Sequence, residues 1–313
     1  MTLDDIQAAA ARIRGHVAET PLVRDDALSD RLGRPVMMKC EHLQPTGAFK
    51  LRGATNAILS LPAGVRGVVT ASTGNHGRAL AHAARALGVS ATVCLSRLVP
   101  ANKVRAIRDL GATVRIVGDS QDQAMAEVAR LVAEEGLTQI PPFDHPDVVA
   151  GQGTIGLEIG APEAVLVPLS GGGLAAGIAV AIKAISPATR VIGLTMENGA
   201  AMAASLRAGR PVEVAEVATL ADSLGGGIGL DNRVTFALCR DLLDRVILLT
   251  ETEIAAAIRH LGRAGHVVEG AAAVGHAALL AGKFAPEGPA VTILSGGNID
   301  PAQHARLMQE DAA

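Results

Sequence analysis

Four short segments of the sequence combine residue types that could bind an anion or react with a carbonyl compound. The first is PTGAFKLRGA, in which Lys50 follows Gly47, Ala48 and Phe49. These apolar neighbours favour a desolvated lysine over a solvated surface charge. An amine in an apolar pocket loses its proton readily and can form a Schiff base. Lys50 is therefore the candidate nucleophile.

The second segment, STGNHG at residues 72–77, places polar side chains at the start of a predicted helix. Ser72 or Thr73 could act only as an N-cap, but a cap needs one such residue and this cluster supplies four. Backbone N–H groups at a helix start bind anions. We therefore expect a carboxylate-binding loop, with Asn75 bonding a polar cofactor atom. The residues of this loop are Ser72, Thr73, Gly74, Asn75 and His76.

Glycine runs make up the other two segments. SGGGL at 170–174 and LSGGN at 294–298 each end an apolar, strand-like run. Three consecutive glycines could cradle a phosphate with unhindered N–H groups, or could form a flexible turn into a closely packed helix. A further run, GQGTIG at 151–156, matches the dinucleotide pattern, but it follows PPFDHPDVVA, a predicted loop rather than a strand.

The elements that must position these segments alternate between strands and helices. Strands are predicted at 67–72, 91–96, 113–117, 164–169, 190–194, 246–250 and 291–295, and helices at 75–87, 100–110 and 120–135. Almost wholly apolar strands separated by helices predict an α/β fold with parallel sheets covered on both faces. Ligands bind at the carboxyl ends of strands in such sheets, which is where the polar segments lie.

Composition weakens several other classes of function. The chain has 313 residues, enough for about two domains, with a net charge of −3, four Phe and neither Tyr nor Trp. It lacks the aromatic platforms of single-strand binding and the basic field of phosphate-backbone binding. We expect no nucleic-acid partner. No secretory signal or membrane-length apolar run is visible, so a cytoplasmic protein without a membrane partner is expected.

Metal and disulfide sites are not expected from the spacing of cysteine and histidine. Cys40, Cys94 and Cys239 are odd in number and widely separated, which favours a reducing compartment. The histidines, among them His76, His82, His145, His260 and His266, are scattered along the chain, so no metal cluster is predicted.

A reactive lysine, an asparagine-bearing carboxylate loop, a glycine-rich phosphate loop and a serine at a late strand end together fit pyridoxal 5′-phosphate. From TPL at 20–22 to SGGNID at 295–300, the chain resembles the threonine/serine dehydratase and serine racemase family, the fold-type II pyridoxal-phosphate enzymes. The resemblance implies a tryptophan-synthase-β-like fold of two open, twisted, mostly parallel sheets flanked by helices. It also implies a large cofactor domain, residues 1–66 plus 144–313, and a small domain, 67–143, with the carboxylate loop.

The family's site residues transfer to matching positions of this sequence. The resemblance makes Lys50 the Schiff-base lysine and Cα base, and gives Thr73 a catalytic hydroxyl. Phe49 would pack against the cofactor ring, Asn75 would bind its phenolic oxygen, and Ser295 would face its pyridine nitrogen. Glu269 would lie near the ring. The phosphate loop would consist of Ser170, Gly171, Gly172, Gly173 and Leu174. AGQGT at 150–154 is a family signature, which replaces the dinucleotide interpretation.

The resemblance implies α,β-elimination of a hydroxy-amino acid to a 2-keto acid and ammonia, in a homodimer. Thr73 stands where a racemase would have serine, so racemisation is weakened but stays open, and Phe143 is the dehydratase-like residue at its position. The acids of the metal site found in several relatives fall on Thr195 and Ala201, so no family-type metal site is expected. Motif variants such as TMENGAAM favour a branch that acts in hydroxyectoine or ectoine breakdown. A β-replacement enzyme and a non-catalytic amino-acid-binding protein are further alternatives.

Overall fold

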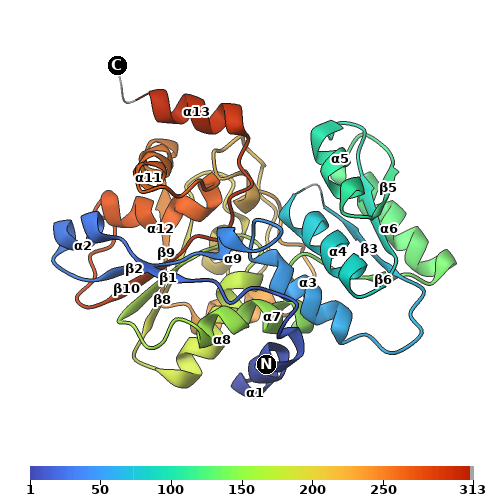
Figure 1. Cartoon of the computed structure of the whole chain (residues 1–313), viewed down its shortest axis with the longest axis horizontal. Coiled ribbons are helices and arrows are strands. Elements are labelled where there is room, and N and C mark those ends of the chain that lie inside the picture. Colours follow the sequence, from blue (N-terminus) through green and yellow to red (C-terminus); the bar gives the residue numbers. More distant parts are fainter. Residues whose placement is uncertain (73, 100, 311–313) are drawn as a thin grey trace.

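The computed structural model describes residues 1–72, 74–99 and 101–310, and within them the strands form two sheets (Figure 1). The larger sheet has the order β1 (Leu22–Arg24), β2 (Val36–Lys39), β10 (Ala290–Ile293), β7 (Ala164–Pro168), β8 (Arg190–Met196) and β9 (Arg245–Leu249). Only the β1–β2 pair among these is antiparallel. The smaller sheet is parallel, with the order β5 (Thr113–Ile116), β4 (Ala91–Leu95), β3 (Val68–Ala71) and β6 (Thr138–Gln139). The predicted α/β fold with two mostly parallel sheets is confirmed.

Helices cover both faces of the larger sheet because its central strands are apolar on both faces. Along β7, Val165 and Val167 pack in one core cluster and Leu166 packs in the other, as the two-residue period of a strand requires. One face is covered by α8 (Gly173–Ile185), α9 (Ala201–Ala208) and α10 (Thr235–Leu242). The other is covered by α2 (Asp26–Leu32), α11 (Glu251–Arg263) and α12 (Gly270–Leu280).

The smaller sheet is covered in the same way and lies at the right of Figure 1. Val68 and Val93 share a core with α3 (Lys50–Leu59), α4 (Asn75–Ala86), α5 (Ala101–Asp109) and α7 (Pro146–Leu157). Val69 and Cys94 face α6 (Gln121–Glu135) on the other side. The strands of this sheet come from residues 68–139, and the domain division at 67 and 143 stays a prediction.

The remaining elements are α1 (Leu3–Ile13), α13 (Pro301–Gln309) and two short 3-10 helices, η1 (Glu41–Leu43) and η2 (Asp222–Leu224). A capping box between Thr2 and Asp5 starts α1. None of the described helices is long and apolar enough to cross a membrane.

The prediction of a loop over PPFDHPDVVA is wrong for its second half. Helix α7 starts at Pro146, because proline fits the first helical position, where no backbone N–H is needed. GQGTIG therefore lies inside a helix, not in a strand-to-helix turn. Its glycines allow close helix packing: a Cβ on Gly151 would lie 2.6 Å from the Cα of Gly53 in α3, and one on Gly153 would lie 2.8 Å from the carbonyl oxygen of Gly177 in α8.

Candidate active site

The four chemistry-bearing segments converge on one cavity of about 1090 Å³. The predicted site residues of the described chain all line it, and Phe143 lines it as well. They are Phe49, Lys50, Ser72, Gly74, Asn75, His76, Ser170, Gly171, Gly172, Gly173, Leu174, Glu269 and Ser295. Thr73, the predicted catalytic hydroxyl, lies outside the described residues.

Lys50 is held at the junction between α3 and the end of β10. Ala48 forms an antiparallel bridge with Gly296, and the Phe49 N–H donates to the Ser295 carbonyl oxygen at 3.0 Å. The Lys50 Nζ donates to the Pro142 carbonyl oxygen at 2.5 Å and lies 5.3 Å from the centroid of the Phe49 ring. Burial lowers the pKa of Lys50 to about 8, against the opposing effect of Glu269. The amine is therefore much easier to deprotonate than an ordinary lysine.

A buried ionic network fixes the first turn of α3, and the sequence analysis missed it. The Arg52 guanidinium is 1% exposed and makes paired contacts with two carboxylates. Its Nε and Nη2 each lie 2.8 Å from Glu41, and its Nη1 and Nη2 lie 2.5 and 2.8 Å from Glu158. Lys39 in β2 contacts Glu158 at 2.5 Å. The network ties the helix that starts at Lys50 to η1 and α7.

Two helix N-termini open into the cavity without a side-chain cap. The N-cap of α4 is Gly74 and that of α8 is Gly172, and glycine has no side chain to bond the first N–H groups. The interpretation of Ser72 as the N-cap of α4 is therefore wrong. Uncapped N–H groups at a helix start bind anions. The cavity can thus hold two anionic groups, one at each helix.

The glycines of the 170–174 loop serve tight packing as well as access to an anion. Gly172 has φ +88°, a conformation that favours glycine, and a Cβ on Gly171 would lie 2.3 Å from the Phe143 ring. The loop is therefore a sharp turn into a closely packed helix, as one alternative predicted. The N-terminus of that helix also faces the cavity, as the phosphate-binding alternative requires.

Asn75 and Glu269 are joined across the cavity. Asn75 Nδ2 donates to the Glu269 carboxylate at 2.8 Å, and Asn75 Oδ1 accepts from Asn298 Nδ2 at 2.6 Å. Burial and the nearby charge of Asp222 together raise the pKa of Glu269 to about 7, against the lowering effect of hydrogen bonds from Ser223 and Asn75. Glu269 can therefore hold or release a proton near neutral pH.

His76 is a neutral, buried group. Its Nε2 lies 2.9 Å from the Ile140 carbonyl oxygen, so Nε2 carries the proton. Burial, with the charge of Lys50, lowers the pKa of His76 to about 3. His76 therefore contributes no cation to an anion site at neutral pH, and its part in the carboxylate loop is limited to its backbone and ring.

Part of the cavity wall went unnoticed in the sequence. The segment from Glu216 to Gly227 contributes to the cavity lining, with Asp222 and Ser223 in η2. Its only chemical signal is a further glycine run, SLGGGIG at 223–229, which follows no predicted strand. Arg78, Lys103 and Gln121 also line the cavity.

Although the histidines are scattered along the sequence, some of them meet in the described part of the fold. Within the described residues, His42 and His266 lie beside Cys40, and His260 and His276 lie beside Asp25. Both clusters lie outside the cavity lining, and their members are far apart in the sequence, which is why the spacing did not reveal them.

Comparison with known proteins places this geometry in a family. The model of the pyridoxal-phosphate-dependent enzymes matches residues 13–296. The chain belongs to that family. A Sinorhizobium fredii protein named as a candidate threonine dehydratase is 58% identical over 98% of this chain and 95% of the relative. The L-threonine ammonia-lyase of Geobacter sulfurreducens is 46% identical over 94% of this chain and 75% of the relative.

The solved structures agree. Maize serine racemase matches with a TM-score of 0.92 and 32% identity over 99% of this chain and 98% of that one. The chain is thus a pyridoxal-phosphate-dependent lyase with the fold of the type II enzymes, as the sequence predicted.

The cavity fits pyridoxal phosphate on its own geometry. The cofactor needs an amine for its aldehyde and donors for its phosphate. The cavity offers the readily deprotonated Lys50 and, at the start of α8, N–H groups with no competing side-chain cap. The second uncapped helix, α4, leaves room for the carboxylate of an amino acid.

Proposed function

We propose that this enzyme eliminates water from a β-hydroxy amino acid such as threonine or serine, giving a 2-keto acid and ammonia. The observation that carries the proposal is the position of Lys50, an amine with a pKa of about 8 in a cavity that two uncapped helix N-termini also line. The names of the threonine dehydratase and ammonia-lyase relatives support the same reaction.

The cofactor contacts are assigned from the cavity lining. Lys50 would hold pyridoxal phosphate through Nζ, and the loop from Ser170 to Leu174 would hold its phosphate. Asn75 would bond the phenolic oxygen. Phe49 would pack against the ring, with Glu269 near it and Ser295 at the pyridine nitrogen. When bound, the cofactor supplies an electron sink for the bonding electrons at the Cα of the amino acid.

The protein's own groups supply binding and proton transfer. The start of α4, from Ser72 to His76, would hold the substrate carboxylate through its backbone N–H groups. Lys50 Nζ would remove the Cα proton, which its lowered pKa favours. Glu269, with a pKa of about 7, would exchange a proton on the side of the cavity where Asn75 lies. A serine at position 295 does not force a proton onto the ring nitrogen, which favours rapid loss of the β-substituent.

Amino-acid racemisation is the second candidate. The likeness to maize serine racemase supports it, and Thr73 has a hydroxyl where a racemase would use serine. Chiral analysis of the products from L-serine and L-threonine separates the two activities. Release of keto acid and ammonia as the main products supports elimination, whereas accumulation of the D-amino acid without keto acid contradicts it.

The biological setting is also part of the proposal. We infer a substrate in threonine or serine breakdown, or in hydroxyectoine breakdown, which the motif variants favour. Residues 67–143 would form a small domain that carries the carboxylate loop, and the enzyme would be a cytoplasmic homodimer. The free thiols of Cys40, Cys94 and Cys239 support a reducing compartment. A keto-acid screen over serine, threonine, 3-hydroxyaspartate and hydroxyectoine-derived amino acids tests the substrate.

A further inference from the structure

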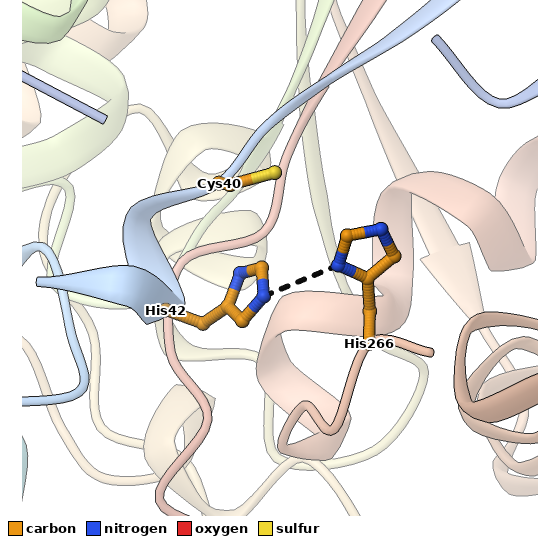
Figure 2. Close-up of side chains that lie close together, drawn as sticks. All are labelled: Cys40, His42 and His266. Carbon is orange, nitrogen blue, oxygen red and sulfur yellow. Dashed lines mark hydrogen bonds between the residues drawn. The ribbon is translucent and has the colours of Figure 1, made fainter. Parts of the chain in front are cut away.

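Outside the cavity lining, Cys40, His42 and His266 form a compact cluster (Figure 2). Cys40 directly follows β2, His42 lies in η1, and His266 lies between α11 and α12. One ligand atom from each of the three side chains lies within 4.8 Å of the others. Figure 2 shows the two imidazoles pointing toward one another with the thiol above them.

The spacing of the two imidazoles matches that of ligands on one metal ion. His42 Nε2 lies 3.3 Å from His266 Nδ1, and the rings are nearly perpendicular, at 83°. Two nitrogens bound at about 2.0–2.1 Å to a tetrahedral zinc ion lie roughly 3.3–3.4 Å apart. Without an ion, the same separation allows one imidazole to donate a hydrogen bond to the other, so the two nitrogens face one another in either case.

The fold gives His42 no complete set of partners. Its Nδ1 is buried and has no hydrogen-bond partner among residues 1–72, 74–99 and 101–310, so the ring is not a core histidine with both nitrogens satisfied. Cys40 is fully buried, whereas His42 and His266 are partly exposed. An ion could therefore enter from the imidazole side and meet the thiol at the inner end.

We propose that Cys40, His42 and His266 bind one Zn²⁺ ion, with water as the fourth ligand. A thiolate with two imidazoles is a ligand set that zinc favours, whereas Mg²⁺ and Ca²⁺ require oxygen ligands. Three protein ligands leave one tetrahedral position open.

We propose no metal site at the second cluster, Asp25, His260 and His276, because the Asp25 carboxylate already has partners. Asp25 Oδ1 accepts from the Leu28 N–H at 2.9 Å as the N-cap of α2, and Asp25 Oδ2 lies 2.6 Å from His260 Nε2. These contacts explain Asp25 as a buried structural group. The cluster provides a matched control for the zinc experiment instead.

An ion bound at Cys40, His42 and His266 would join two segments that both contact residues 294–297, next to the active site. The His42 N–H donates to the Leu294 carbonyl oxygen at 2.9 Å, and a Cβ on Gly297 would lie 3.4 Å from the His42 Cβ. The Glu269 N–H, three residues after His266, donates to Gly296 at 3.1 Å. Zinc should therefore raise the melting temperature of the holoenzyme, because an ion that binds only the native state stabilises it.

The test is zinc binding by the untagged holoenzyme, measured by atomic emission after dialysis and by competition with a chelator. The wild type should retain one zinc per chain. Cys40→Ser and His266→Ala should each weaken zinc binding by more than about a hundredfold. Loss of a residue that only contacts a ligand from outside the coordination sphere would weaken it less. His260→Ala, which removes a histidine of the other cluster, should leave zinc affinity unchanged. Bound Co²⁺ should show a thiolate charge-transfer band that Cys40→Ser removes.

Far-UV circular dichroism and cofactor absorbance establish that each variant is folded. If Cys40→Ser loses its cofactor, the partly exposed His266→Ala decides the question. The proposal is overturned if the wild type binds no zinc above the level of His266→Ala, or if His260→Ala rather than His266→Ala loses it.

Discussion

Replacement of Arg52 by methionine tests whether the buried ionic network holds the helix that begins at Lys50. The positive charges of Arg52 and Lys39 balance the negative charges of Glu41 and Glu158 in a buried site. Arg52→Met leaves an excess negative charge at Glu41, which is fully buried. Removal of one partner from a buried ion pair costs about 3–5 kcal/mol. That is a large part of the about 5–15 kcal/mol that stabilises a typical domain.

The assay is urea unfolding of the holoenzyme at neutral pH, followed by circular dichroism, with the cofactor content of each variant measured in parallel. The double variant Glu41→Gln with Arg52→Met restores charge balance, so its loss of stability should be smaller than the sum of the single losses by about 1–3 kcal/mol. Arg97→Met is the matched control: Arg97 makes two 3.0 Å contacts with Asp119, but both side chains are exposed, and little change is expected.

Two results would refute this reasoning. One is an Arg52→Met variant as stable as Arg97→Met. The other is strict additivity in the double variant, because it would mean that Glu41 and Arg52 stabilise the fold independently despite their 2.8 Å contacts.

Three further predictions concern the cavity itself. The unfolding free energy should fall as pH rises from 4.5 to about 7, because native Glu269 keeps its proton over that range while an unfolded glutamate loses it. Glu269→Gln should remove about 3 kcal/mol of this pH dependence. If the urea midpoint of Glu269→Gln changes with pH as much as that of the wild type, the prediction is contradicted. Gly171→Ala should weaken pyridoxal-phosphate binding about tenfold or more, since its Cβ would overlap the Phe143 ring. Absorbance titration measures this binding. Adding Phe143→Leu to Gly171→Ala should partly restore it if the overlap is the cause. Ser295→Asp should raise transamination relative to elimination, measured as the ratio of the two products, and an unchanged ratio would disprove the role given to the serine.

The sequence predicted most of the strands, including the edge strands β5 and β9, and missed β1, β2 and the two-residue strand β6. Strands such as β7 and β10 are buried on both faces, so their contiguous apolar runs are distinctive. The strand β1 has three residues and faces solvent at two of them, which leaves no pattern to detect. Helix α7 was misread in its first half because Pro146 signals a break inside a helix but a favourable start at its first position.

The site was predictable where chemistry follows directly from a strand end. Lys50, Asn75, Ser295 and the 170–174 loop are local motifs at the carboxyl ends of parallel strands or beside them, and such ends converge. The Arg52 network was not predictable, because its partners at positions 41 and 158 meet only through the packing of η1, α3 and α7. The Cys40 cluster is of the same kind: 224 residues separate His42 from His266.

The central claim, elimination that depends on Lys50, is tested most directly by keto-acid release from L-threonine and L-serine by the purified holoenzyme and by Lys50→Ala. We predict that the wild type is yellow and releases 2-keto acid and ammonia in equal amounts from at least one β-hydroxy amino acid, and that Lys50→Ala loses the lysine-bound cofactor absorbance together with the activity. Keto-acid release at the wild-type rate by a folded Lys50→Ala variant would contradict the account.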